Sequence, residues 1–257
     1  MNILNSIKRQ IPNTITLCNL TCGVLASIYA VKSEITSYDT FTEGSDPMYL
    51  AIAATFILLG IFFDFFDGLS ARLLKVSSPL GKELDSLADV ITSGIAPGLI
   101  LFEILSTSTN LVWLKYIALL TPALAAYRLA KFNLDTRQSH SFLGLPTPAN
   151  ALIWVGIAYI YCFAPVSEVG LLFENTGLLA MAIISVCTAI LMIGELPMFS
   201  LKFNFKDMSW KTNQVQYIFL AGCVALIIAL RQFSLSFVIL WYIALSLIIN
   251  KKKPSHE

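Results

Sequence analysis

Four aspartates lie close together in an apolar part of the chain, at Asp64, Asp67, Asp85 and Asp89. An ionised side chain near the middle of a membrane helix costs roughly 2.5–3.5 kcal/mol, so such residues usually serve a function. An aspartate side chain is also too short to reach far toward water. The four carboxylates therefore predict a polar cavity rather than four separate contacts with lipid.

Helix geometry places these carboxylates on two stripes. At about 100° per residue, the residues of the first stripe fall within an arc of roughly 140°, and those of the second within a narrower one. The stripes consist of Asp64, Asp67, Gly68, Ala71 and Arg72 on one helix, and of Gly81, Asp85 and Asp89 on the next. The linker between the helices, residues 73–80, is short, so we expect antiparallel neighbours whose stripes face each other.

Four converging carboxylates would repel one another strongly unless divalent cations neutralise them, because Arg72 is the only Lys or Arg on the two stripes. The chain has only two histidines, His140 and His256, so the expected ligands are all oxygen. Such a set favours Mg²⁺ or Mn²⁺ over zinc. Gly68 and Gly81 leave room for a ligand or for the other helix.

The composition predicts the surroundings of this site. Of the 257 residues 56% are hydrophobic and 13% charged, against about 25% charged in soluble domains. This excludes a water-soluble enzyme and a disordered chain, and a net charge of +1 excludes a nucleic-acid-binding protein. We expect an all-α polytopic membrane bundle that forms one integral-membrane domain over residues 1–257.

The chain contains about eight apolar segments of the length that a membrane span needs, about 20 residues. They are residues 12–32, 48–71, 84–106, 111–131, 148–165, 175–194, 214–231 and 233–250. The last two are separated by little more than residues 231–233, so seven spans remain the main alternative.

Basic residues in the loops predict the orientation. With eight spans, 14 of the 17 Lys and Arg residues fall on one side of the membrane, and this side is the cytoplasm by the positive-inside rule. Both termini, the short tail 251–257 and the aspartate site are then expected on the cytoplasmic side of the plasma (inner) membrane.

The spacing of the two stripes is also a specific signature. The pattern reads Asp64-x2-Asp67-Gly68-x2-Ala71-Arg72-x8-Gly81-x3-Asp85-x3-Asp89. At all eight defined positions it resembles the signature of the CDP-alcohol phosphotransferase family. The resemblance implies transfer of a phosphoalcohol from a CDP-linked donor to an acceptor hydroxyl, with release of CMP.

The same resemblance implies roles for the signature residues. Asp64, Asp67 and Asp85 would hold two divalent ions on the donor pyrophosphate. Asp89 would be an additional ligand or the base that takes the acceptor's proton. The nucleotide pocket would be lined by Gly68, Ala71, Arg72 and Gly81.

Four further motifs resemble the serine-transferring branch of the family, the integral-membrane phosphatidylserine synthases. They are Pro12-Asn13-x-Ile15-Thr16-x2-Asn19-x3-Gly23, Tyr127-Arg128-x2-Lys131-Phe132-Asn133, Gly144-Leu145-Pro146-Thr147-Pro148 and Pro197-Met198-x-Ser200-x-Lys202. This likeness implies CDP-diacylglycerol and L-serine as substrates, phosphatidylserine and CMP as products, eight helices and a homodimer.

Two groups of polar residues outside the signature are candidates for substrate binding. Asn13 and Thr16 give the first helix a polar edge that can contact CDP-diacylglycerol, or bond to another helix. Arg128 suits the planar carboxylate of serine, with Lys131 and Asn133 assisting. The cations can equally serve as anchors at the cytoplasmic boundary.

Three other functions remain open on the sequence. Transfer to glycerol 3-phosphate or inositol phosphate would call for a denser basic pocket than Arg128 and Lys131 provide. A prenyltransferase of the UbiA type also uses membrane aspartates, but its two aspartate motifs lie far apart in sequence. A cation-coupled transporter would not require Ala71, Arg72 and Gly81 at fixed spacing.

Overall fold

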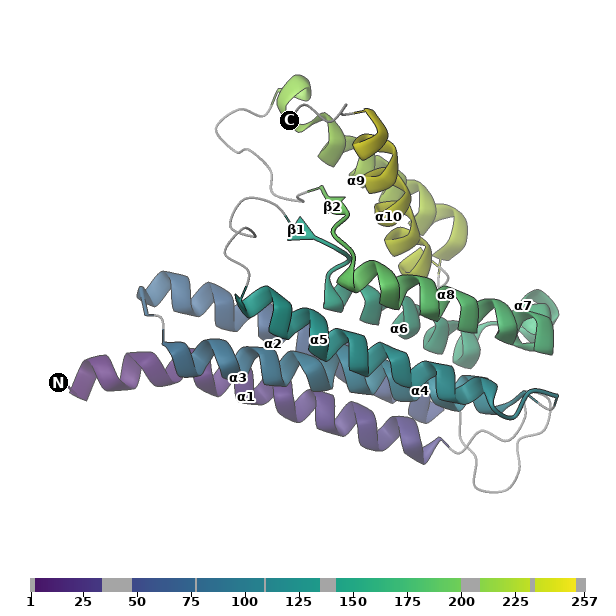
Figure 1. The fold of residues 1–257 in the computed structure, drawn as a ribbon, viewed down its shortest axis with the longest axis horizontal. Coiled ribbons are helices and arrows are strands. Elements are labelled where there is room, and N and C mark those ends of the chain that lie inside the picture. The colour runs from purple at the N-terminus through teal and green to yellow at the C-terminus, as the bar shows by residue number, and fades with distance from the viewer. Residues whose placement is uncertain are drawn as a thin grey trace.

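The computed structural model describes residues 3–33, 48–76, 78–108, 110–134, 142–199, 209–231 and 234–252 (Figure 1). Nearly all of these residues are helical. The helices of the N-terminal half are α1 (Ile3–Lys32), α2 (Met48–Leu74), α3 (Pro79–Asp89), the π-helical η1 (Val90–Ile95), α4 (Ala96–Ser106), the 3-10 segment η2 (Leu114–Leu119) and α5 (Leu120–Leu134). The C-terminal half adds α6 (Thr147–Phe163), α7 (Val166–Phe173), α8 (Asn175–Ile193), α9 (Trp210–Leu230) and α10 (Ser234–Lys252).

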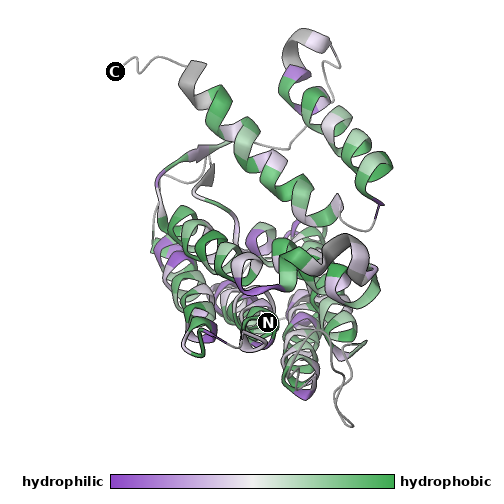
Figure 2. Cartoon of the chain, turned by 90° about the vertical axis from the view of Figure 1, so that its right-hand side faces the viewer, coloured by the Kyte–Doolittle hydropathy of each residue, from purple (hydrophilic) through white to green (hydrophobic). Residues whose placement is uncertain are grey.

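The helices α1 to α6 and α8 run side by side along the longest axis, whereas α9 and α10 lean away from them (Figure 1). Hydrophobic residues predominate along the helices, with hydrophilic residues interspersed (Figure 2). The core includes Leu50, Ile57, Ile100 and Ile104, which are fully buried. Two short strands, β1 (Phe142–Leu143) and β2 (Pro197–Met198), pair antiparallel and join the chain after α5 to the chain after α8.

Five helical stretches among the described residues are long and apolar enough to cross a membrane: Gln10–Lys32, Met48–Leu74, Pro79–Ser106, Asn175–Ile193 and Asn213–Leu230. Shorter apolar helices run over Thr147–Phe163 and Ser234–Ile249. The predicted all-α polytopic membrane bundle is thus confirmed. The number of eight spans and the cytoplasmic side of both termini stay predictions. Residues 253–257 of the tail, His140, Ser200 and Lys202 lie outside the described residues.

The segment expected as a continuous span at 111–131 has a different start. It begins with the 3-10 turns of η2, and regular α-helix is reached only at Leu120. The apolar pattern of this segment is that of a single helix. Such a pattern does not reveal where the backbone bonds change from the α-helical to the 3-10 type.

The helix that carries Asp85 and Asp89 also departs from regular geometry, directly after Asp89. Within η1 the N–H of Ala96 bonds to the carbonyl of Ile91, five residues back. Such π-helical turns are rare in proteins, and those that occur are often found at functional sites. Thr92 of η1 donates to the Asn19 carbonyl of α1 at 3.1 Å, and it approaches α2 where a Cβ on Gly60 would clash with it.

A tight turn fixes α3 against α2. The N–H of Val76 bonds to the Ala71 carbonyl at 3.0 Å and that of Lys75 to the Arg72 carbonyl at 3.2 Å, with Lys75 at a φ of 53°. This is a Schellman ending of α2. Ser78 then caps α3 by accepting from the Gly81 N–H at 2.9 Å, and Pro79 occupies the first turn, where it is favoured. The short linker therefore brings the two aspartate stripes together.

Candidate active site

Three of the four signature aspartates form one cluster. A carboxylate oxygen from each of Asp64, Asp67 and Asp85 lies within 4.8 Å of the other two. Asp67 is 6% exposed, whereas Asp64 and Asp85 are partly buried. The expectation that the stripes of α2 and α3 face each other is confirmed for these residues. An all-oxygen set of this kind fits a hard divalent cation such as Mg²⁺ or Mn²⁺.

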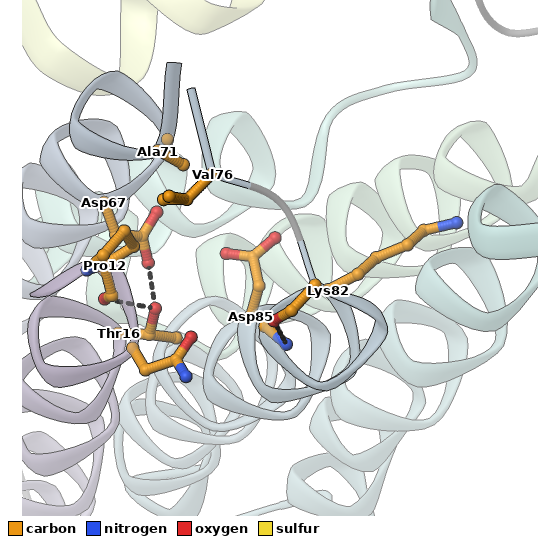
Figure 3. Close-up of a pocket in the computed structure, with 11 residues that line it drawn as sticks. Pro12, Thr16, Asp67, Ala71, Val76, Lys82 and Asp85 are labelled. Atoms are coloured by element: carbon orange, nitrogen blue, oxygen red, sulfur yellow. Dashed lines mark hydrogen bonds between the residues drawn. The ribbon is translucent and has the colours of Figure 1, made fainter. Parts of the chain in front are cut away.

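The first helix orients the Asp67 carboxylate. Thr16 Oγ1 lies 2.5 Å from Asp67 Oδ2 and 3.0 Å from the Pro12 carbonyl one turn earlier (Figure 3). Because a hydroxyl has a single hydrogen, Thr16 shares it between these two acceptor oxygens. Thr16, which is 3% exposed, therefore holds Asp67 from the side of α1.

Asp89 lies beside this cluster, at the point where α3 passes into η1. Asn19 Nδ2 donates to Asp89 Oδ1 at 3.3 Å. Asp89 also interacts electrostatically with Asp85 and with the guanidinium of Arg128 on α5. Asp89 is therefore close enough to α5 to be influenced by the positive charge of Arg128.

A cavity of about 260 Å³ opens next to the cluster. Its walls come from α1, α2, α3 and the α2–α3 linker: Pro12, Asn13, Thr16, Asp67, Gly68, Ala71, Val76, Ser78, Gly81, Lys82 and Asp85. The carboxylates of Asp67 and Asp85 point into the space between α2 and α3, whereas the amine of Lys82 extends away (Figure 3).

Five of the six residues expected to bind the nucleotide lipid line this cavity, all but Arg72. Arg72 is exposed, and its Nε donates to the Gly68 carbonyl at 2.9 Å. The lack of room for a side chain explains why position 81 is a glycine. A Cβ on Gly81 would lie 3.0 Å from Asn13 Oδ1 and 3.1 Å from Ser78 Oγ. The roles of all six residues stay predictions.

The three expected serine-binding residues have different surroundings. Arg128 is 8% exposed; its Nη1 donates to Thr147 Oγ1 of α6 at 2.8 Å, and its guanidinium lies 5.9 Å from the Phe132 ring. Lys131 forms an exposed ion pair with Glu195 at 3.3 Å. Asn133 Nδ2 donates to Ser86 Oγ at 2.8 Å. Of the three, Arg128 is the one that interacts with Asp89.

The sequence assigned no role to three residues that the structure connects to Arg128 directly or through a neighbour. Thr147 accepts from Arg128, and Asn150 follows Thr147 by three residues on α6. The phenol of Tyr242 on α10 donates to the Phe199 carbonyl at 3.1 Å and interacts electrostatically with Arg128. The spacing of Asn150 from Thr147 was the available signal, since residues three apart share a helix face. Nothing in the sequence connects Tyr242 to Arg128.

Fold and site together define a membrane-embedded helical protein whose carboxylate cluster can hold a divalent metal beside a cavity. Residues 9–193 match the CDP-alcohol phosphatidyltransferase family, and the chain belongs to this family. It is accordingly a transferase of phospholipid biosynthesis with a CDP-linked substrate, as the signature predicted.

The chain is similar to several proteins named CDP-diacylglycerol–serine O-phosphatidyltransferase. It is 33% identical over 152 residues to that of Bacillus subtilis, which is 59% of this chain and 76% of the relative. The Saccharomyces cerevisiae protein is 39% identical over 145 residues, 52% of this chain and 49% of the relative. The Helicobacter pylori (strain 26695) protein is 27% identical over 255 residues, 95% of this chain and 96% of the relative.

Proposed function

We propose that this protein transfers the phosphatidyl group of CDP-diacylglycerol to the hydroxyl of L-serine, giving phosphatidylserine and CMP. The observation that carries the proposal is the buried guanidinium of Arg128, which interacts electrostatically with Asp89 of the aspartate signature. The names of the relatives, one of which matches almost from end to end, support the same acceptor.

The cavity and the aspartate cluster are the proposed binding site of the donor. Asp64, Asp67 and Asp85 would hold two Mg²⁺ or Mn²⁺ ions, the number that the family signature implies for a pyrophosphate. When bound, such ions neutralise the pyrophosphate and stabilise the departing CMP. Asn13 and Thr16 from α1, with Gly68, Ala71 and Gly81, would surround the nucleotide. Arg72, which bonds to the Gly68 carbonyl, would bind the nucleotide from outside this lining.

The acceptor requires a base and a recognition site. We assign Asp89 as the base that takes the proton of the serine hydroxyl, or as a fourth metal ligand; the Asn19 amide orients it. Arg128, which interacts electrostatically with Asp89, would bind the serine carboxylate. Lys131 and Asn133 would assist from α5, although both have partners in this structure. The reaction is assigned to the cytoplasmic face of the plasma membrane, in a homodimer.

Release of CMP by the purified protein tests the proposal. With CDP-diacylglycerol present, L-serine should produce CMP and an equal amount of phosphatidylserine, measured by mass spectrometry. Glycerol 3-phosphate and inositol phosphate should not raise CMP release above the level without acceptor. CMP release that depends on one of these instead would reassign the acceptor. Cation flux into vesicles without any CDP-diacylglycerol would favour a transporter.

Arg128→Ala should raise the KM for serine by about 10- to 100-fold, equivalent to roughly 1.4 to 2.7 kcal/mol, with little change for CDP-diacylglycerol. Arg128→Lys should recover only part of this loss, because an ammonium cannot make a bidentate contact. Steady-state kinetics with serine and with serinol, which lacks the carboxylate, measure the effect. An equal loss for both acceptors would instead make Arg128 a structural anchor.

A further inference from the structure

Asn150 lies in the first turn of α6, and its side chain is fully buried. Its backbone N–H bonds to the Pro146 carbonyl at 3.1 Å. Both polar atoms of the amide, Nδ2 and Oδ1, have no hydrogen-bond partner within the described part of the chain. A buried polar group without a partner costs about 1–3 kcal/mol, so an amide in this position calls for a function.

The neighbours of Asn150 are polar as well. Thr147, also fully buried, lies three residues earlier on the same face of α6. Its hydroxyl accepts from Arg128 Nη1, while Arg128 Nε has no partner among the residues that the structure describes. A guanidinium N–H that bonds to no described residue and a complete amide group thus lie on either side of one threonine, which Arg128 contacts directly and which Asn150 follows by one helical turn. Arg128 also interacts electrostatically with Asp89.

The chemistry of these groups selects one class of ligand. The unpaired guanidinium N–H and the first turn of a helix both favour an anion. The amide of Asn150 offers two donor hydrogens and an acceptor oxygen. An amino acid carries a carboxylate and an ammonium group on neighbouring atoms, and it matches this arrangement. A phosphorylated acceptor has no cationic donor for Asn150 Oδ1.

We propose that Asn150 is a specificity-determining residue for an amino-acid acceptor. Asn150 Nδ2 donates to the acceptor carboxylate beside Arg128, and Asn150 Oδ1 accepts from the ammonium group. This inference rests on the proposed function, because it assigns a further residue to the same acceptor site. It explains why two buried groups on different helices, α5 and α6, lack partners together.

Asn150→Asp and Asn150→Leu test the assignment, with serine and serinol as the two acceptors at saturating CDP-diacylglycerol. Asn150→Leu should raise the serine KM by about 10-fold, because both contacts are lost. Asn150→Asp keeps the acceptor for the ammonium but repels the carboxylate. It should therefore raise the ratio of kcat/KM for serinol over serine by at least about 10-fold.

Tyr159→Phe is the matched control on the same helix, since its hydroxyl pairs with Thr55 at 3.0 Å away from Arg128. This variant should keep the wild-type ratio. The affinity for CDP-diacylglycerol reports whether each variant is folded. Asn150→Gln replaces any variant that does not bind CDP-diacylglycerol. We expect Asn150→Gln to raise the serinol-to-serine ratio of kcat/KM as well, but by less.

The outcomes separate the two claims. Wild-type protein that releases no CMP with serine overturns the proposed function. Wild-type protein that is active with serine, together with Asn150 variants that bind CDP-diacylglycerol and keep the serinol-to-serine ratio, overturns the assignment of Asn150 alone.

Discussion

Asp64→Asn is expected to lower the rate of CMP release by at least about 10³-fold, or about 4 kcal/mol of transition-state stabilisation. Asp64 contributes one of three carboxylates whose oxygens lie within 4.8 Å of one another. An amide in its place cannot neutralise a cation, so the variant can lose the metal itself. Asp67→Asn and Asp85→Asn should behave alike. The measurement is serine-dependent CMP release over a range of Mg²⁺ and Mn²⁺ concentrations.

Removal of metal should reproduce this effect in the wild-type protein. Chelation should abolish turnover, and added Mg²⁺ or Mn²⁺ should restore it. Glu83→Gln is the matched control, because Glu83 is an exposed carboxylate on the same helix as Asp85. This variant should keep its activity and its metal dependence. Near-normal turnover in Asp64→Asn would refute the metal assignment.

Asp89→Asn should give the second large effect, a decrease in rate of roughly 10²- to 10⁴-fold if Asp89 is the general base. Asp89 accepts from Asn19 and lies outside the group of three clustered carboxylates. Binding of CDP-diacylglycerol and of Mn²⁺ should then stay near the wild-type level. Single-turnover kinetics and Mn²⁺ binding measured by electron paramagnetic resonance distinguish the roles. Loss of Mn²⁺ binding would make Asp89 a ligand instead.

Local rules were sufficient to predict the aspartate cluster. The period of the α-helix sets which residues of α2 share a stripe, and a linker of a few residues forces α3 to return alongside. Both rules depend only on neighbouring positions in the chain. They therefore predicted that Asp64, Asp67 and Asp85 converge, and they also placed Gly68, Ala71 and Gly81 near one another.

Contacts between distant segments could not be predicted in this way. The approach of Arg128 to Thr147 depends on how α5 and α6 pack, and the electrostatic interaction of Tyr242 with Arg128 depends on the position of α10. Lys131 and Asn133 follow Arg128 on the same helix, yet they turn to Glu195 and Ser86. A pattern of cations at a helix end does not reveal which cation is buried against another helix and which forms an exposed ion pair.

The π-helical turn of η1 bears on how this chain tolerates insertions and deletions. A turn closed by a bond five residues back holds one residue more than an α-turn. The orientation of α3 relative to α4 is therefore that of a regular α-helix with one residue fewer between them. Asp85 and Asp89 face α2 and α1, while Gly94 and Gly98 lie against Pro122 of α5. Deleting a residue within 90–95 can convert the turn to regular α-helix and keep both orientations. A deletion between Asp85 and Asp89, within α3 itself, would instead rotate Asp85 by about 100° relative to Asp89 and α4.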